Sequence, residues 1–245
     1  MTPAPHAILF DLDETILTFG RRRDQLLAVA ADFVGADGGG LSPEALAHAV
    51  DARVTAFWSD KTRIALWRNR VAEARYIAVT EAFAEMAAAG AVHLTPEAAH
   101  RFADDFHALR VAQIKPFPGA VETLDALRAA GVRMALITNG PAAIQRAKID
   151  RFDLARRFDH VQVEGECGFG KPEARAYRHA LAALGAGAHE AWIVGDNLEW
   201  EVAAPQKLGI HAIWCDAYEA GLPPDGTVKP DRIIRSLTEL SPTRP

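Results

Sequence analysis

The stretch that decides the fold is HAILFDLDETIL, residues 6–17. Its segment Ala7–Phe10 is short, continuous and apolar, which predicts a strand buried on both faces of a parallel sheet. Asp11 then lies at the carboxyl end of that strand, where open α/β sheets bind ligands. Because side chains alternate along an extended chain, Asp11 and Asp13 can project toward the same region.

Two carboxylates placed this close together repel one another unless a cation lies between them or one of them holds a proton. A divalent metal ion resolves the repulsion and leaves Asp11 or Asp13 to attack while the other moves protons. The pattern Asp-x-Asp-x-Thr is by itself also compatible with an N-terminal loop, a helix cap or the metal-binding motif of a glycosyltransferase. The rest of the chain has to separate these interpretations.

The segment that follows reads as helical. From about Arg21 to Lys115 the apolar residues recur with helical spacing, and no run has the character of a strand. Ser42-Pro43 and Thr95-Pro96 are helix-start signals, and glycines at 38–40 predict a break between the first two helices. A longer helix is expected from about Arg63 to Ala89.

From Pro116 onward strands and helices alternate. Strands are expected at 134–137, 161–163 and 191–194, with weaker candidates at 212–214 and 233–234. This alternation predicts an α/β fold, a doubly wound parallel sheet of the Rossmann-like kind. Residues 1–18 and 116–245 are therefore expected to form the core, and residues 19–115 an inserted helical domain.

Composition narrows the function classes. The chain has 245 residues, is 49% hydrophobic and carries a formal net charge of −5. This charge argues against a general nucleic-acid or anionic-membrane binder. We find no apolar stretch of bilayer length and no signal-peptide pattern, and the two cysteines form no CxxC motif, so we expect a cytoplasmic protein. The sequence does not distinguish a monomer from a homodimer.

Polar groups follow two more of the expected strands. Thr138-Asn139-Gly140 places a hydroxyl and exposed backbone amides before a helix, which suits an anionic oxygen. Lys171 stands between a glycine pair and a proline, where a fixed ammonium group can neutralise a phosphoryl oxygen. The simpler interpretations are an ordinary turn and a solvated surface lysine.

A further strand is followed by Gly195-Asp196-Asn197, with Glu201 on the next helix. Asp and Glu offer the oxygen ligands that Mg²⁺ prefers. A helix cap at Asp196 explains the same residue without a metal. Because these segments all follow strands of one parallel sheet, we expect them to meet at the same edge.

Together the four segments DLDET, ITNG, GKPEARAY and GDNLEWE resemble, in order and spacing, the four motifs of the haloacid dehalogenase superfamily, over residues 7–215. The resemblance implies that the helical insertion is a cap domain and that the cofactor is Mg²⁺. It further implies the following roles: Asp11 as nucleophile and metal ligand, Asp13 as general acid/base and metal ligand through its carbonyl, Thr138, the Asn139 amide and Lys171 as phosphate-binding groups, and Asp196 as metal ligand.

Two positions depart from the family pattern. The last acidic position of the fourth motif is Glu201 instead of aspartate, and its longer side chain is still expected to reach a metal-bound water. Tyr177 stands where the family usually has phenylalanine, a change expected to affect packing only.

Asp13 favours one reaction over another. An alkoxide leaving a phosphate monoester needs a proton, whereas a departing halide does not, and dehalogenases of the superfamily lack this second aspartate. The sequence therefore predicts a phosphatase acting on a small phosphorylated metabolite. A phosphomutase, a 2-haloacid dehalogenase and a non-catalytic phosphate-binding regulatory module stay open as alternatives.

One cluster in the helical segment bears on the substrate. Arginine can grip a carboxylate or a second phosphate, and tryptophan can stack on a base or sugar. Packing of the tryptophans between helices, with the basic groups in solvent, is the simpler interpretation. The cluster consists of Trp58, Lys61, Trp67, Arg68 and Arg70.

Overall fold

The computed structural model describes residues 5–37, 41–90, 94–224 and 226–240, apart from the side chains of Asp37, Lys61 and Ala65. The chain divides into two compact units, a core unit of residues 1–18 and 115–245 and a helical unit of residues 19–114. Lys115 belongs to the core unit, because β3 (Lys115–Pro116) pairs antiparallel with β2 (Leu17–Thr18). A pair of two-residue strands is too short for sequence periodicity to reveal.

The core unit is built on a six-stranded parallel sheet in the order β5-β4-β1-β6-β7-β8. Its central strand β1 (Ala7–Phe10) pairs with β4 (Arg133–Thr138) on one side and β6 (Ala191–Gly195) on the other. The chain thus proceeds outward from β1 in both directions, which creates a switch point at the carboxyl ends of these three strands. The remaining strands are β5 (His160–Val163), β7 (His211–Cys215) and β8 (Arg232–Ile234). The predicted α/β class is confirmed.

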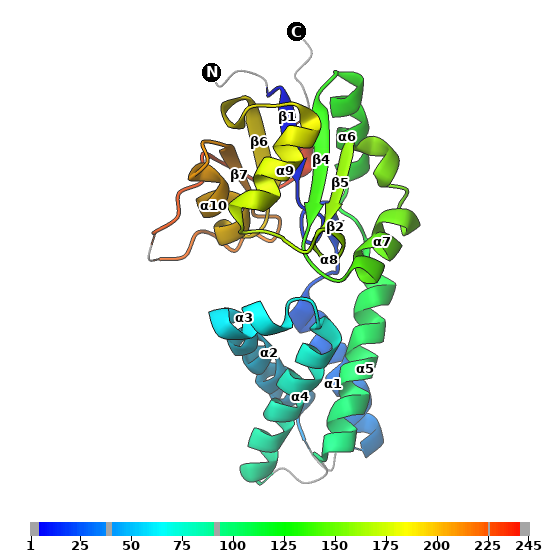
Figure 1. Ribbon diagram of the computed structural model, residues 1–245. Helices are drawn as coiled ribbons and strands as arrows, with labels where there is room; N and C mark the ends of the chain where they lie inside the picture. The colour runs from blue at the N-terminus through cyan, green and yellow to red at the C-terminus, as the bar shows by residue number, and fades with distance from the viewer. Residues whose placement is uncertain (1–4, 38–40, 91–93, 225, 241–245) are drawn as a thin grey trace. The chain divides into compact units, whose positions relative to one another are not determined.

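Both faces of the sheet are covered, as the continuous apolar run of β1 predicts. Ala7 and Leu9 share a buried cluster with Tyr177 of the helix α9, which Figure 1 shows lying across the sheet. Phe10 instead meets Phe158 edge-on, with ring centroids 6.1 Å apart. The α-helices of the core unit are α6 (Ala120–Ala129), α7 (Ala142–Arg151), α8 (Glu164–Cys167), α9 (Ala174–Leu184) and α10 (Ala204–Gln206). The unit also contains 3₁₀-helices at Ala155–Arg157, Ala188–Glu190 and Leu237–Leu240 and a π-helix at Leu198–Ala203.

Two helices of the helical unit begin where the sequence predicts. Ser42 caps one helix by accepting from the Ala45 amide at 3.3 Å, and Thr95 caps another by accepting from the Ala98 amide at 3.2 Å. The predicted break at 38–40 lies outside the described residues. The helices are α1 (Arg22–Asp37), α2 (Pro43–Ser59), α3 (Lys61–Trp67), α4 (Val71–Ala88) and α5 (Pro96–Gln113).

The prediction of one helix from Arg63 to Ala89 is wrong. Two helices, α3 and α4, occupy this stretch, and the chain turns between them with Arg70 at φ −128° and ψ 48°. The Arg70 amide donates to the Trp67 carbonyl at 2.8 Å, which closes the turn. Glycine or proline, the residues that usually reveal such a break, are absent from this turn.

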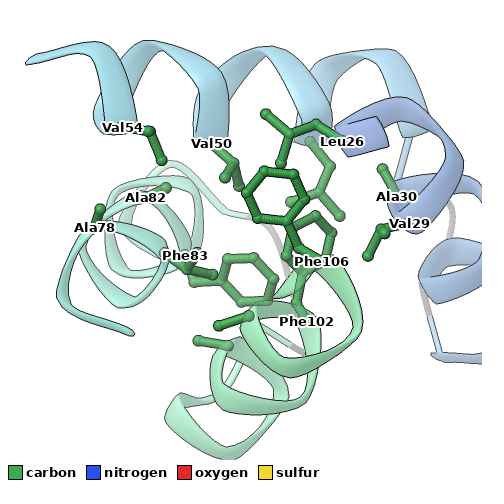
Figure 2. Packing of buried hydrophobic residues seen from close by; sticks show 14 of the residues in the cluster. Leu26, Val29, Ala30, Val50, Val54, Ala78, Ala82, Phe83, Phe102 and Phe106 are labelled. Carbon is green, nitrogen blue, oxygen red and sulfur yellow. The ribbon is translucent and has the colours of Figure 1, made fainter. Parts of the chain in front are cut away.

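The helical unit has an apolar core of its own. Figure 2 shows Phe83 and Phe102 of α4 and α5 meeting residues of α1 and α2. Phe102 lies edge-on to Phe33 and Phe83, with ring centroids 5.9 and 5.5 Å apart, an arrangement that aromatic quadrupoles favour. Within the described ranges, each helix is too short or too polar to cross a bilayer.

Candidate active site

Asp11 extends the central strand by one residue. Its amide donates to the Val194 carbonyl of β6 at 3.0 Å, so β6 holds the backbone in place. Asp11 is 8% exposed, and its carboxylate accepts hydrogen bonds from Lys171 Nζ at 2.5 Å and from Thr15 Oγ1 at 3.2 Å. Burial raises the pKa of Asp11, and the charge of Lys171 opposes that rise. A buried carboxylate at the end of β1 is thus held by an ammonium group from a distant part of the chain.

Lys171 is not a solvated surface lysine. Its side chain is 1% exposed, and its ammonium group lies 2.5 Å from Asp11 Oδ1 and 2.7 Å from Glu201 Oε1. Burial alone lowers the pKa of Lys171, but the two carboxylates outweigh burial and raise it above its ordinary value. A fixed positive charge therefore stands against the Asp11 carboxylate.

Glu201 is held from two directions. Besides the contact with Lys171, its Oε2 accepts from the Asn197 amide at 2.9 Å. Gly195 permits this placement, because a Cβ there would lie 2.0 Å from Glu201 Cγ. Burial raises the pKa of Glu201 to about 7, against the opposing charge of Lys171. In this structure the Glu201 carboxylate therefore forms an ion pair with the buried Lys171 ammonium and helps to hold it in place.

Asp196 follows β6 as Asp11 follows β1. Trp214 Nε1 donates to its carbonyl at 2.6 Å, which fixes the loop. Burial, followed by the charges of Asp11 and Glu201, raises the pKa of the Asp196 carboxyl well above its ordinary value. The carboxyl groups of Asp11, Asp196 and Glu201 thus repel one another electrostatically, and a bound cation would relieve this repulsion.

The donors at this edge fit Mg²⁺. Among the described residues, His, Cys, Asp and Glu side chains do not form groups of three or more that could hold a metal ion. Asp11 and Asp196 supply two carboxylates, and Mg²⁺ is usually held by one or two carboxylates together with several waters. The donor set is therefore chemically suited to this ion.

The Thr138 and Asn139 side chains have contacts that the sequence did not indicate. Thr138 is buried at the end of β4. The Asn139 side chain both donates a hydrogen bond to the Lys171 backbone and accepts one from it. Asn139 Oδ1 accepts from the Lys171 amide at 2.9 Å, and its Nδ2 donates to the Lys171 carbonyl at 2.6 Å. The resemblance implied a role for the Asn139 amide, but its side chain also joins the second and third motifs.

Asp13 has partners that sequence reasoning missed. Lys148 Nζ lies 2.6 Å from both of its carboxylate oxygens, and Gln145 Nε2 donates to Oδ2 at 3.0 Å. The same Gln145 nitrogen donates to Thr138 Oγ1. The available signal was the pair of polar residues three apart on the first helix after the second motif, a spacing that puts both on one helix face.

Tyr177 was expected to affect packing only, and this is incomplete. Its ring is buried against the sheet, but its hydroxyl also donates to the Trp200 carbonyl at 2.5 Å. Phenylalanine at this position would lose that bond. The hydroxyl thus ties α9 to the segment that carries the fourth motif.

The aromatic and basic cluster lies in the helical unit. Trp58 packs edge-on against Phe57 at 5.3 Å, and the Arg70 guanidinium lies 4.6 Å from the Trp67 ring centre. Arg70 also forms an ion pair with Glu73. Arg68 is partly buried in the turn between α3 and α4, and the side chain of Lys61 lies outside the description. Trp67 and Arg70 thus find partners within the helical unit.

Residues of all four motif segments thus meet at the carboxyl edge of the sheet. Residues 5–209 match the family of haloacid dehalogenase-like hydrolases. The chain belongs to this family. The resemblance inferred from the sequence is confirmed, and the parallel sheet of the core unit is the α/β fold that the resemblance implied.

Curated relatives cover part of the chain. A phosphoserine phosphatase from Thermus thermophilus is 37% identical over 146 residues, which span 59% of this chain and 57% of that protein. A glyceraldehyde 3-phosphate phosphatase from Methanocaldococcus jannaschii is 31% identical over 105 residues, which span 43% of this chain and 46% of that protein. The chain thus spans about half the length of these relatives.

Solved structures share the fold. The HAD-hydrolase YfnB from Bacillus subtilis, crystallised with magnesium, is 19% identical with a TM-score of 0.70 over 96% of both chains. A 2-haloacid dehalogenase from Pseudomonas syringae is 24% identical with a TM-score of 0.55, covering 96% of this chain and 95% of that one. Because hydrolases of different reactions share this fold, the fold alone does not choose between them.

Proposed function

We propose that this protein is a Mg²⁺-dependent phosphomonoester hydrolase that acts on a small phosphorylated metabolite through an aspartyl-phosphate intermediate. The observation that carries the proposal is the buried Asp11 carboxylate, held 2.5 Å from the Lys171 ammonium at the carboxyl edge of the sheet. Relatives that are phosphatases support the reaction class. Two free cysteines fit a reducing compartment, and we propose the cytoplasm.

Each residue has a defined task in this proposal. Asp11 attacks the phosphorus in line, and the bond from phosphorus to the leaving oxygen breaks as the bond to Asp11 forms. Asp13 donates its proton to that oxygen and then, as a carboxylate, takes a proton from the water that hydrolyses the aspartyl-phosphate. Lys171 neutralises phosphoryl charge, and we assign phosphate binding also to Thr138 and the Asn139 amide.

The proposed role of the metal ion is electrostatic. Asp11, Asp196 and the Asp13 carbonyl would hold Mg²⁺, whose charge would lower the repulsion between the anionic nucleophile and the anionic phosphate. The excess of buried carboxylates over ammonium groups around Asp11 supports a cation at this place. Glu201 then acts on the site through Lys171.

Asp13 favours phosphate transfer over dehalogenation. Displacement of a halide needs no proton donor, so a carboxylate held by Lys148 and Gln145 beside Asp11 has no task in that reaction. The regulatory alternative would require a site that no longer turns over, although all four motifs carry their polar groups. The phosphatase therefore remains the best supported function.

The test is a screen of the purified protein against phosphorylated metabolites and p-nitrophenyl phosphate, with Mg²⁺ or with EDTA. We expect phosphate release with Mg²⁺ and loss of turnover on chelation. The variant Asp11→Asn should be folded and inactive, because an amide cannot form the acyl-phosphate. Asp153→Asn, a change of an exposed carboxylate in the core unit that pairs with Arg156, is the matched control and should leave turnover unchanged.

Three outcomes contradict the proposal. Full turnover after exhaustive EDTA treatment would show that the reaction needs no metal ion. Retained activity of Asp11→Asn, with contamination excluded, would show that another residue is the nucleophile. Halide release from 2-haloacids without phosphate release from any monoester replaces the phosphatase with a dehalogenase.

A further inference from the structure

The helix α7 carries two buried polar side chains, three residues apart. Gln145 is 2% exposed and Lys148 is 6% exposed, and their spacing puts them on one face of the helix. Burial of an ammonium group is costly unless it is paired. A buried lysine therefore needs a partner that compensates the cost of its burial, and for Lys148 that partner is Asp13.

The contacts cover both oxygens of Asp13. Lys148 Nζ lies 2.6 Å from Oδ1 and from Oδ2, and Gln145 Nε2 adds a bond of 3.0 Å to Oδ2. Bonds to both oxygens restrict rotation of the carboxylate about its own axis, which a single contact does not. The Gln145 amide also bonds Thr138 Oγ1, so one side chain fixes Asp13 relative to the end of β4.

The exposure of the pair is unequal. The Asp13 side chain is 32% exposed, whereas that of Lys148 is 8% exposed. The ammonium group thus lies beneath a carboxylate that is open on its other side. A pair that only satisfied a buried lysine would not require this carboxylate to stay accessible.

We propose that Lys148 and Gln145 are positioning residues that hold the Asp13 carboxylate in the orientation for proton transfer. This inference rests on the proposed function, in which Asp13 exchanges protons with the leaving oxygen and with water. Lys148 and Gln145 act through Asp13, and the proposal gives neither of them a contact with substrate. Orientation of a catalytic group within about 0.5 Å is what such supporting contacts supply.

The experiment compares Lys148→Met with wild type on an alkyl phosphate and on p-nitrophenyl phosphate. Loss of an outer partner that orients a metal ligand typically costs about 10–100-fold in metal affinity or activity, and we take the same range for a partner that orients Asp13. We expect a loss in that range in kcat on the alkyl phosphate, with KM little changed. On p-nitrophenyl phosphate, whose leaving group needs little protonation, we expect a burst of nitrophenolate followed by slow turnover. Lys148→Arg should recover part of the lost rate.

A double-mutant cycle tests whether Lys148 acts through Asp13. If it does, Lys148→Met adds little loss to an Asp13→Asn variant, because residues that act as a unit are not additive. Arg146→Met, which removes a partly exposed positive charge from the same helix, is the matched control and should behave as wild type. If Lys148→Met does not fold, Gln145→Met, a neutral change of similar length, carries the same cycle.

The outcomes separate the two proposals. The positioning role alone is overturned if the wild-type protein hydrolyses monoesters and Lys148→Met does so at the wild-type rate. It is also overturned if the loss caused by Lys148→Met multiplies the loss caused by Asp13→Asn in the double variant. Equal losses on both substrates without a burst also overturn it, because they indicate general damage to the site. Absence of phosphate release by the wild-type protein overturns the proposed function and this inference with it.

Discussion

The carboxyl edge of the sheet and the interior of the helical unit are built on opposite principles. At the edge, charged groups are buried against one another: Lys171 and Glu201 are each 1% exposed, and Asp11 is 8% exposed. In the described part of the helical unit, Gln25 is the one buried polar residue, and the buried cluster between the helices consists of apolar residues. Buried charge weakens a fold unless it is compensated, so its concentration at one edge indicates function.

The ion pairs of the helical unit point the same way. Arg22 meets Asp51 at 2.6 Å and Arg63 meets Glu81 at 3.0 Å, in pairs whose side chains are about one-third exposed. Exposed pairs of this kind are typically worth about 0–1 kcal/mol. The helical unit is thus a structure held by apolar packing, whereas the sheet edge holds the buried charged groups to which we assign the chemistry. The following changes test that division.

The largest effect is expected for Asp13→Asn. General acid catalysis typically contributes about 10²–10⁴-fold, so turnover of alkyl phosphates should fall by that factor. Activated p-nitrophenyl phosphate needs little help in the first step but still needs a base in the second. Rapid-quench measurements should therefore find a burst of nitrophenolate and accumulation of phosphorylated Asp11.

The matched change in the helical unit is Asp51→Asn, which removes a carboxylate paired with Arg22. We expect no effect on either phase. If Asp13→Asn slowed both substrates by the same factor and no phosphoenzyme accumulated, Asp13 would be a metal-site residue only. The assigned proton transfers would then be wrong.

An intermediate effect, on stability, is expected for Phe102→Ala in the helical unit. Phe102 is fully buried and meets Phe33 and Phe83 edge-on. Truncation of a buried phenylalanine costs about 3–5 kcal/mol, so the free energy of unfolding of this unit should fall by that amount. Denaturant unfolding measures the loss, and hydrogen exchange should locate it in α1, α4 and α5.

The control for this change is Leu27→Ala, at a leucine that is 39% exposed. Its cost should stay within about 0.5 kcal/mol. A small loss for Phe102→Ala would mean that the apolar cluster does not hold the helical unit together. Loss of protection in β1 and β4 by the same amount would mean that the core unit and helical unit unfold as one.

The same division explains what the sequence could predict. The strands β1, β4 and β6 and the helix starts at Ser42 and Thr95 follow from local patterns, because apolar runs and capping residues act over a few positions. The order of strands in the sheet then brings Asp11 and Lys171 together, although 160 positions separate them in the chain. Asp11 directly follows β1, whereas Lys171 follows β5 only after the short helix α8. The strand pattern therefore predicts that both groups lie at the same edge of the sheet, but not the contact between them.

What could not be predicted depends on tertiary contacts. Lys148 and Gln145 look like the exposed residues of an ordinary helix, and only the packing of α7 in the fold buries them beside Asp13. The turn at Arg70 carries no glycine or proline and is stabilised by contacts with Trp67 and Glu73. Side chains whose role depends on a partner far away in the sequence leave no periodic signal.

The smallest effect is expected for Arg70→Ala, which addresses the substrate interpretation of the helical cluster. Arg70 is 56% exposed at its side chain, stacks on Trp67 and pairs with Glu73, so its contacts are satisfied within the helical unit. We therefore expect a stability change of at most about 1 kcal/mol and an unchanged ratio of kcat/KM among phosphorylated substrates. Lys148→Met is the contrasting change, because it removes a buried charge from the sheet edge. A loss confined to substrates with a second anionic group would place Arg70 at the substrate, since a guanidinium group grips carboxylate and phosphate selectively. The helical unit would then contribute to chemistry, and the division between the two regions would have to be abandoned at this residue.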